Sequence, residues 1–95
     1  MMDLSALDLN LLVAVDALLA EESVTAAAKR LHLSQPACSQ ALARARVLLG
    51  DPLLVRRGQR MVPTPTAKAL KEPLRRALTE LEAVVLGRQR FDPQQ

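Results

Sequence analysis

The sequence predicts a mainly α-helical fold in which three helices and a small β-hairpin are followed by one long helix. Its apolar residues recur at helical spacing in four segments, and each segment begins at a residue suited to cap a helix. The chain has one phenylalanine and neither tryptophan nor tyrosine, so leucine, alanine and valine must build the core. Leucine and alanine favour helices. Ninety-five residues make one small domain with a marginal core, for which a second copy is a plausible source of stability.

The first helix is expected over residues 8–21, with Asp8 as its N-cap. Its apolar residues repeat at i, i+1, i+4, i+7 and i+8, and they are Leu11, Leu12, Val15, Leu18 and Leu19. Ser23 is suited to cap a second helix that ends at Leu31. The inner side of this helix consists of Val24, Ala27, Ala28 and Leu31. About two turns are too short to be stable alone, so this helix must belong to a compact unit.

A third helix is expected from Ser34, its N-cap, to Gly50, which ends it. Pro36 falls in the first turn, where the absent N–H is harmless. The stripe expected to be buried consists of Cys38, Ala41, Leu42, Ala45, Leu48 and Leu49. The opposite face contains small neutral groups and no acid, and its members are Gln35, Pro36, Ser39, Gln40 and Ala43.

Residues 52–62, PLLVRRGQRMV, indicate a β-hairpin, because two β-prone runs flank a basic segment that contains Gly58. The tip of this hairpin would carry Arg56, Arg57 and Arg60.

Thr64 and Pro65 are expected to open a last helix that reaches about residue 87. Pro73 should kink it or loosen one hydrogen bond. Nothing earlier in the sequence is left to cover its long apolar stripe, so we expect this helix to pair with a second copy. The residues expected at that interface are Leu70, Leu74, Leu78, Leu81 and Val85.

The net charge of +3 hides an asymmetry, because residues 23–71 hold nine basic side chains and one acid, Asp51. On charge alone, a polyanionic partner and a solvated arginine-rich surface explain this segment equally well. The single cysteine, Cys38, excludes an intrachain disulfide, and no Cys/His spacing suits a metal. The N-terminus has acids where a signal peptide needs basic residues, and the longest apolar run, Leu11–Val15, is too short for a membrane span. We therefore expect a cytoplasmic protein that uses no metal, cofactor or membrane.

A short helix, a tight turn and a second helix with an acid-free outer face indicate a helix-turn-helix. In the major groove of double-stranded DNA, phosphates would repel a carboxylate on that face. Glutamine pairs with adenine through two hydrogen bonds, serine bonds to bases or phosphate, and proline offers an apolar surface to a thymine methyl. The helix N-terminus attracts phosphate, and the hairpin arginines would reach the backbone or a minor groove. The residues predicted to read bases are Gln35, Pro36, Ser39 and Gln40.

Four segments of the sequence stand out together, and they are LDLNLL at 7–12, SVTAAAKRLHLSQPACSQAL at 23–42, LLGDPLLVR at 48–56 and VPTPTA at 62–67. Together they resemble the N-terminal domain of LysR-type transcriptional regulators, in the branch that includes nodulation and aromatic-degradation regulators. The resemblance implies a winged helix-turn-helix over 1–63, a linker helix over 64–87 that pairs two subunits, and a tail over 88–95 that leads to an effector domain absent here. It also implies binding to an interrupted palindrome at promoters, with a small-molecule inducer acting only through the absent domain.

The resemblance also suggests which residues contact DNA. It implies base contacts from Gln35, Pro36 and Ser39, and it places Ser34 and Thr25 near phosphate. The wing arginine of the family corresponds to Arg56 or Arg60 in this sequence. Gln40 stands where many family members have arginine or histidine.

Several of these residues also have an ordinary structural interpretation. Gln35 and Ser39 could be plain surface residues, Cys38 is a core residue rather than a redox sensor, and His32 is a turn residue or a phosphate contact. Arg44, which we include among the candidate phosphate contacts, and Arg46 could equally be solubilising surface residues.

Other function classes compete with DNA binding to different degrees. A protein-interaction module is the main alternative, since the long apolar helix is an interaction surface. The sequence does not favour an enzyme, because it has one histidine, no glycine-rich phosphate loop and no paired carboxylates. RNA binding is weakened by the lack of aromatic residues for stacking.

Overall fold

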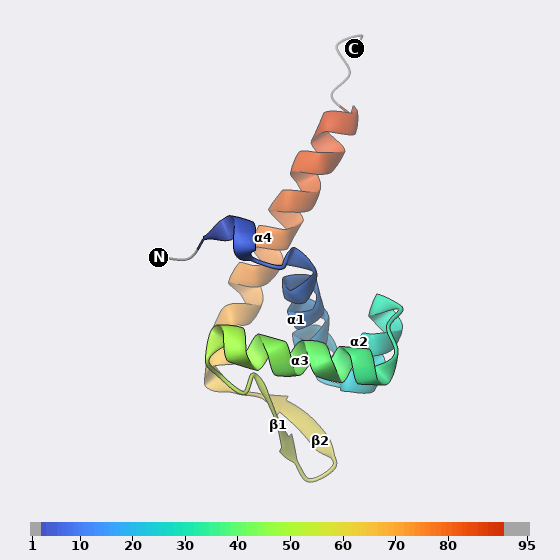
Figure 1. Cartoon of the computed structure of the whole chain (residues 1–95), viewed down its shortest axis with the longest axis vertical. Coiled ribbons are helices and arrows are strands. Elements are labelled where there is room, and N and C mark those ends of the chain that lie inside the picture. The colour runs from blue at the N-terminus through green and yellow to red at the C-terminus, as the bar shows by residue number, and fades with distance from the viewer. Residues whose placement is uncertain (1–2, 91–95) are drawn as a thin grey trace.

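The computed structural model describes residues 3–90, with side chains up to residue 87. Its elements are the 3-10 helix η1 (Leu4–Ala6), α1 (Leu9–Glu21), α2 (Val24–Leu31), α3 (Gln35–Leu49), β1 (Leu54–Arg57), β2 (Arg60–Pro63) and α4 (Pro65–Arg90). The antiparallel hairpin projects from one side of α3, while α4 rises in the opposite direction (Figure 1). The predicted mainly α-helical winged helix-turn-helix is confirmed, and η1 is an addition to it. Within the described residues, no helix is long and apolar enough to cross a membrane.

All four predicted N-caps form, and each supplies an acceptor for an N–H group at the start of its helix. Asp8 Oδ1 accepts from the backbone of Asn10 at 2.9 Å, and Ser23 Oγ accepts from that of Ala26 at 3.1 Å. The same arrangement joins Ser34 Oγ to the backbone of Ala37 at 3.2 Å and Thr64 Oγ1 to that of Ala67 at 3.1 Å. The starting points of the helices are therefore fixed by local hydrogen bonds.

Each of the first three α-helices ends at a residue in the left-handed region, and these residues are Glu22, His32 and Gly50, with φ of 52°, 58° and 62°. Only Gly50 could be foreseen, because glycine adopts this conformation without strain. The backbone N–H of His32 donates to Lys29 O at 3.2 Å, which confirms the turn role of His32. Glu22 and His32 let the chain begin the next helix within three residues, whereas Gly50 leads toward the hairpin, and α1, α2 and α3 pack together.

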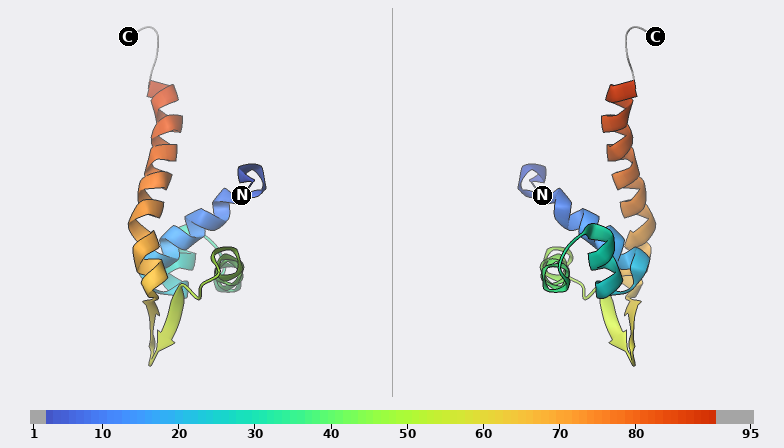
Figure 2. Two further views of the ribbon diagram at one scale, coloured as in Figure 1. Left: turned by 90° about the vertical axis from the view of Figure 1, so that its left-hand side faces the viewer. Right: turned by 90° about the vertical axis from the view of Figure 1, so that its right-hand side faces the viewer.

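α1 lies at the centre of the fold, with α2 and α3 on one side and α4 on another (Figure 2). It is buried on more than one face for this reason, and its buried residues are Leu11, Ala14, Val15, Ala17, Leu18 and Leu19. Cys38 of α3 is fully buried in the same core, and that burial raises the pKa of its thiol. The structure thus confirms that Cys38 is a core residue.

The apolar stripe of α4 divides into two halves with different surroundings. In the first half, Leu74 is only 7% exposed, and Leu70 and Leu78 pack against the same core. An ion pair of 3.1 Å between Arg75 Nη2 and Asp16 Oδ2 also joins α4 to α1. The expectation that nothing in the chain covers this stripe is therefore wrong for the first half.

The second half of the stripe has no cover within the described residues. Leu81, Val84 and Val85 are 48%, 63% and 58% exposed. The helix continues through the exposed Pro73 and reaches Arg90, three residues beyond the predicted end. Residues 91–95 of the predicted tail lie outside the described residues.

Candidate nucleic-acid interface

A cleft of about 540 Å³ lies between the start of α2, the start of α3 and the hairpin. It brings together five of the residues predicted to contact DNA, and these are Thr25, Gln35, Ser39, Arg56 and Arg60. Within the cleft, Gln35 Nε2 lies 3.5 Å from Ser39 Oγ, as expected for neighbours one turn apart on a helix. Two neutral hydrogen-bonding groups therefore lie beside two arginines from the hairpin.

Other predicted contact residues lie outside this cleft. Ser34 and Pro36 are exposed at the start of α3. Gln40 and Arg44 line a separate hollow of about 320 Å³ beside α1. Arg57 is on the other side of the hairpin from Arg56, because successive residues of a strand point to opposite faces.

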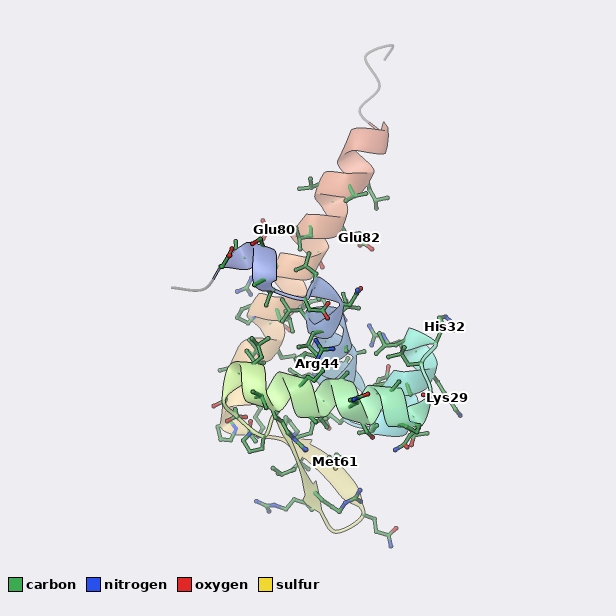
Figure 3. The ribbon with its side chains drawn as sticks, viewed as in Figure 1. Lys29, His32, Arg44, Met61, Glu80 and Glu82 are labelled. Carbon is green, nitrogen blue, oxygen red and sulfur yellow. The ribbon has the colours of Figure 1, made fainter. Side chains whose placement is uncertain are left out.

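Arg44 points toward α1 rather than toward the hairpin. Its Nη2 lies 3.3 Å from Asp8 Oδ2 in an exposed ion pair. Figure 3 shows Arg44 and the hairpin residue Met61 on opposite sides of α3. Ion pairs between exposed groups contribute less than about 1 kcal/mol, so Arg44 is held only weakly in this position.

The sequence reasoning missed two acids that line the cleft. Glu21 and Glu22 lie at the end of α1, and the left-handed turn at Glu22 brings them beside Gln35 and Ser39. Glu21 Oε2 is paired with Arg30 Nη1 at 3.2 Å. No local pattern could reveal this position, because it depends on how α1 and α3 pack.

The sequence reasoning also missed Gln59, which lines the cleft from the turn of the hairpin. The sequence could have indicated Gln59, because this residue follows Gly58 in the predicted tip of the hairpin.

The interpretation of Arg46 as a surface solubiliser is wrong. Its Nε donates to the carbonyl of Pro52 and its Nη2 donates to that of Leu54, both at 2.8 Å. At about 100° per residue, the side chain of Arg46 leaves α3 only about 20° from the direction of Gln35. Arg46 is half-buried and ties the hairpin to the face of α3 that lines the cleft.

Asp51 completes this attachment. Its Oδ2 accepts from the backbone N–H of Leu53 at 2.8 Å and from Thr64 Oγ1 at 2.6 Å. Leu53 is 1% exposed and adopts φ of 65°, a conformation that is strained for a leucine. We refer to Arg46, Asp51, Leu53 and Thr64 as the junction, because they join α3, the hairpin and α4.

The hydrogen bonds of the junction favour the charged form of Asp51. The hydroxyl of Thr64 contributes most to lowering the pKa of this carboxyl below 3.8, and the N–H of Leu53 contributes next. A carboxyl with a lowered pKa stabilises the fold above its ordinary pKa, and this stabilisation is lost as the pH falls through the lowered value.

Comparison with known proteins places this arrangement in a family. The family model for bacterial regulatory helix-turn-helix proteins of the lysR family matches residues 9–68, which is more than half of the chain. The chain belongs to the lysR family. This membership confirms the predicted LysR-type helix-turn-helix domain, which is a regulatory domain and not an enzyme domain.

Relatives of this lysR-family chain include nodulation proteins. The chain is 51% identical over 92 residues to Nodulation protein D 1 from Bradyrhizobium sp. (strain NC92), and the match covers 97% of the chain. It covers 29% of that relative, so the chain spans less than a third of the length of the curated protein. The predicted resemblance to the nodulation branch is confirmed.

Solved structures of similar proteins share the fold. The probable transcriptional regulator PA0477 from Pseudomonas aeruginosa matches with a TM-score of 0.80 and 43% identity, covering 86% of this chain and 28% of that one. The CbnR_DBD chain, solved in a complex with DNA, matches with a TM-score of 0.74 and 32% identity. That match covers 90% of this chain and 97% of the other.

We expect Asp51→Asn to lower the free energy of unfolding at pH 7 and to flatten its decline in acid. The wild type should lose stability as the pH falls below about 4, the ordinary range for this group, whereas the variant lacks that titration. Urea unfolding at pH 7 and at several values down to pH 2.5 measures both effects.

Thr64→Val completes a double-mutant cycle with Asp51→Asn, because it removes the main hydrogen-bond donor to Asp51. It also removes the cap of α4, and that loss is the same with or without Asp51→Asn and cancels in the cycle. In the Thr64→Val background, Asp51→Asn should have a smaller effect, because the two groups interact directly. Identical acid profiles for the wild type and Asp51→Asn would show that the junction carboxylate does not stabilise the fold.

Proposed function

We propose that this chain binds double-stranded DNA sequence-specifically as a homodimer, within a transcriptional regulator of the bacterial cytoplasm. In this proposal α3 enters the major groove and the hairpin enters the neighbouring minor groove. The observation that carries it is the cleft in which Gln35 and Ser39 lie beside Arg56 and Arg60. Neutral hydrogen-bonding groups suit base edges, and flanking cations suit the phosphates on either side.

The first turns of α3 hold the groups that we assign to base reading. Gln35 and Ser39 occupy the edge nearest the hairpin, Pro36 lies near the middle of the exposed face, and Gln40 occupies the edge nearest α1. These residues span a little over a third of the helix circumference, as the spacing of 100° per residue requires. We therefore assign base contacts to Gln35, Pro36 and Ser39, and a further one to Gln40 at the opposite edge.

The positions of the neighbouring residues indicate which of them contact phosphates. Ser34 and Thr25 lie at the starts of α3 and α2, where unpaired N–H groups and the helix dipole attract anions. Arg56 and Arg60 approach the backbone from the hairpin. Arg44 would have to leave Asp8 to reach a phosphate, and the weakness of that exposed pair permits the exchange.

The protein-interaction alternative rests on the exposed half of α4, and a second copy of this chain accounts for that surface. We propose that Leu81 and Val85 pack against their equivalents in the other subunit. Leu70, Leu74 and Leu78 already pack against the core of the same chain. They therefore fix the orientation of α4 and leave little surface for the dimer interface. A two-fold dimer presents two copies of α3, which matches an interrupted palindrome.

We propose DNA binding and dimerisation as the two functions of this chain. We assign no inducer, metal or other cofactor to these residues, and small-molecule recognition belongs to a further domain of the regulator.

The decisive test of sequence reading is Gln35→Ala. On a site selected by the wild type from random DNA, the variant should lose about 1–3 kcal/mol of binding free energy, and much less on a scrambled duplex. Selectivity should relax at one base pair in each half-site, because the dimer presents Gln35 twice. Fluorescence anisotropy on both duplexes measures the difference.

Ser34→Ala is the contrasting variant in this test, because it removes the helix cap together with a proposed phosphate contact and should weaken binding to both duplexes alike. Loss of the cap should cost about 1 kcal/mol of stability, whereas Gln35→Ala should leave stability almost unchanged. Equal losses for Gln35→Ala on cognate and scrambled duplexes would mean that this face positions the protein without reading sequence.

Dimerisation is tested by Leu81→Asp and Val85→Asp, because both residues are exposed and their replacement leaves the core intact. Each variant should sediment as a monomer in analytical ultracentrifugation and bind the palindrome much more weakly. Leu74→Asp is unsuitable, since Leu74 is part of the core.

Ala83→Asp provides the matched control, since Ala83 lies about 200° around α4 from Leu81. It should leave the dimer intact. If the Leu81 and Val85 variants sediment as the wild type does, the exposed half of α4 is not the interface.

A further inference from the structure

The hairpin has a second basic surface on the side away from the cleft. A hollow of about 560 Å³, which we call the outer hollow, is lined by Arg57, Arg60, Val62, Pro63, Pro65 and Lys68. No acid lines it. Arg56 faces the cleft and Arg57 faces the outer hollow, while Arg60 borders both. Three cations therefore gather around this surface, and Lys68 is the one that lies outside the predicted DNA contacts.

This arrangement is electrostatically unfavourable in the free protein. Arg57 and Arg60 are direct partners in the hairpin register, and like charges in such pairs are destabilising. Lys68 lies at the start of α4, where the helix dipole disfavours a cation and where the first turn contains no acid. In the part of the chain that the structure describes, none of these three side chains takes part in an ion pair, and Glu72, one turn beyond Lys68, does not reach it.

We propose that the outer hollow binds phosphates of the same DNA duplex, with Lys68 of α4 as a further contact beside the predicted wing residue Arg57. This inference rests on the proposed function. A minor groove is about 6 Å wide and is bounded by two rows of phosphates. A hairpin that enters it presents one face to each row, so Arg56 serves one row while Arg57 and Lys68 serve the other.

The chemistry of Arg57 and Lys68 suits contacts with a row of phosphates. The guanidinium of Arg57 bonds phosphate through two parallel N–H groups, and the ammonium of Lys68 acts as a mobile point charge. A bound phosphate also removes the repulsion between Arg57 and Arg60. Binding thus compensates the electrostatic cost that the free protein carries.

The test compares Lys68→Gln with Lys71→Gln on a random-sequence duplex. Both lysines are exposed on α4, but only Lys68 lines the outer hollow. The slope of log Kd against log salt should become shallower by about 0.9 for Lys68→Gln, because one phosphate contact is lost. Arg57→Gln should give a similar change, and Lys71→Gln should match the wild type.

Random DNA keeps this test separate from the proposed sequence reading, because phosphate contacts carry no sequence information. A wild type that binds all sequences equally would contradict sequence-specific binding and leave the slope test valid. Equal slopes for Lys68→Gln, Lys71→Gln and the wild type would overturn the outer hollow. Urea unfolding should show that Lys68→Gln is at least as stable as the wild type, so a changed slope reports binding and not folding.

A second arm distinguishes DNA phosphate from a free anion. In an NMR titration of the protein with inorganic phosphate alone, the amides of Arg57 and Lys68 should shift only at concentrations above several millimolar. Saturation at micromolar phosphate would assign the outer hollow to a small anion and overturn its role on DNA.

Discussion

The position of the hairpin relative to α3 depends on the hydrogen bonds of one carboxylate and one guanidinium. Asp51 Oδ2 joins Leu53 to Thr64, and Arg46 donates to the carbonyls of Pro52 and Leu54. Leu53 is thereby kept in a left-handed conformation that costs roughly 1 kcal/mol or more for a residue other than glycine. Burial of Leu53 and its hydrogen bonds offset that cost, and the chain turns sharply from α3 into β1.

The same few residues also set the direction of α4. Thr64 donates to Asp51 and at the same time caps α4 through the N–H of Ala67. The hairpin, α3 and α4 are therefore joined within one hydrogen-bonded unit. In a two-fold dimer, the angle at this junction fixes the distance between the two copies of α3 and so the spacing of half-sites. A change at Asp51 or Arg46 would consequently affect DNA binding without touching DNA.

Features that depend on residues close together in the sequence could be predicted. The caps at Asp8, Ser23, Ser34 and Thr64 act within three residues, so the start of each α-helix could be predicted. The outer face of α3 and the hairpin turn near Gly58 follow from helical spacing and from glycine.

Features that depend on contacts between residues far apart in the sequence could not be predicted. Nothing near Leu74 in the sequence indicates that α1 covers it, and the cover of half of α4 was missed for that reason. The pairing of Arg44 with Asp8 joins residues 36 positions apart, and the bonds of Arg46 depend on how the hairpin folds back. The outer hollow could not be predicted from the sequence, because its lining depends both on the strand register of the hairpin and on where α4 begins.

The most direct test of the junction is ¹⁵N relaxation of the free protein with Arg46→Met, compared with Arg44→Met as the matched control. Arg44 lies on the same helix but makes no bond to the hairpin. With the junction intact, the amides of β1 and β2 should have order parameters near ~0.85, and Arg46→Met should lower them toward ~0.6 while α1 is unchanged. Unchanged order in β1 and β2 of Arg46→Met would contradict the claim that this junction positions the hairpin.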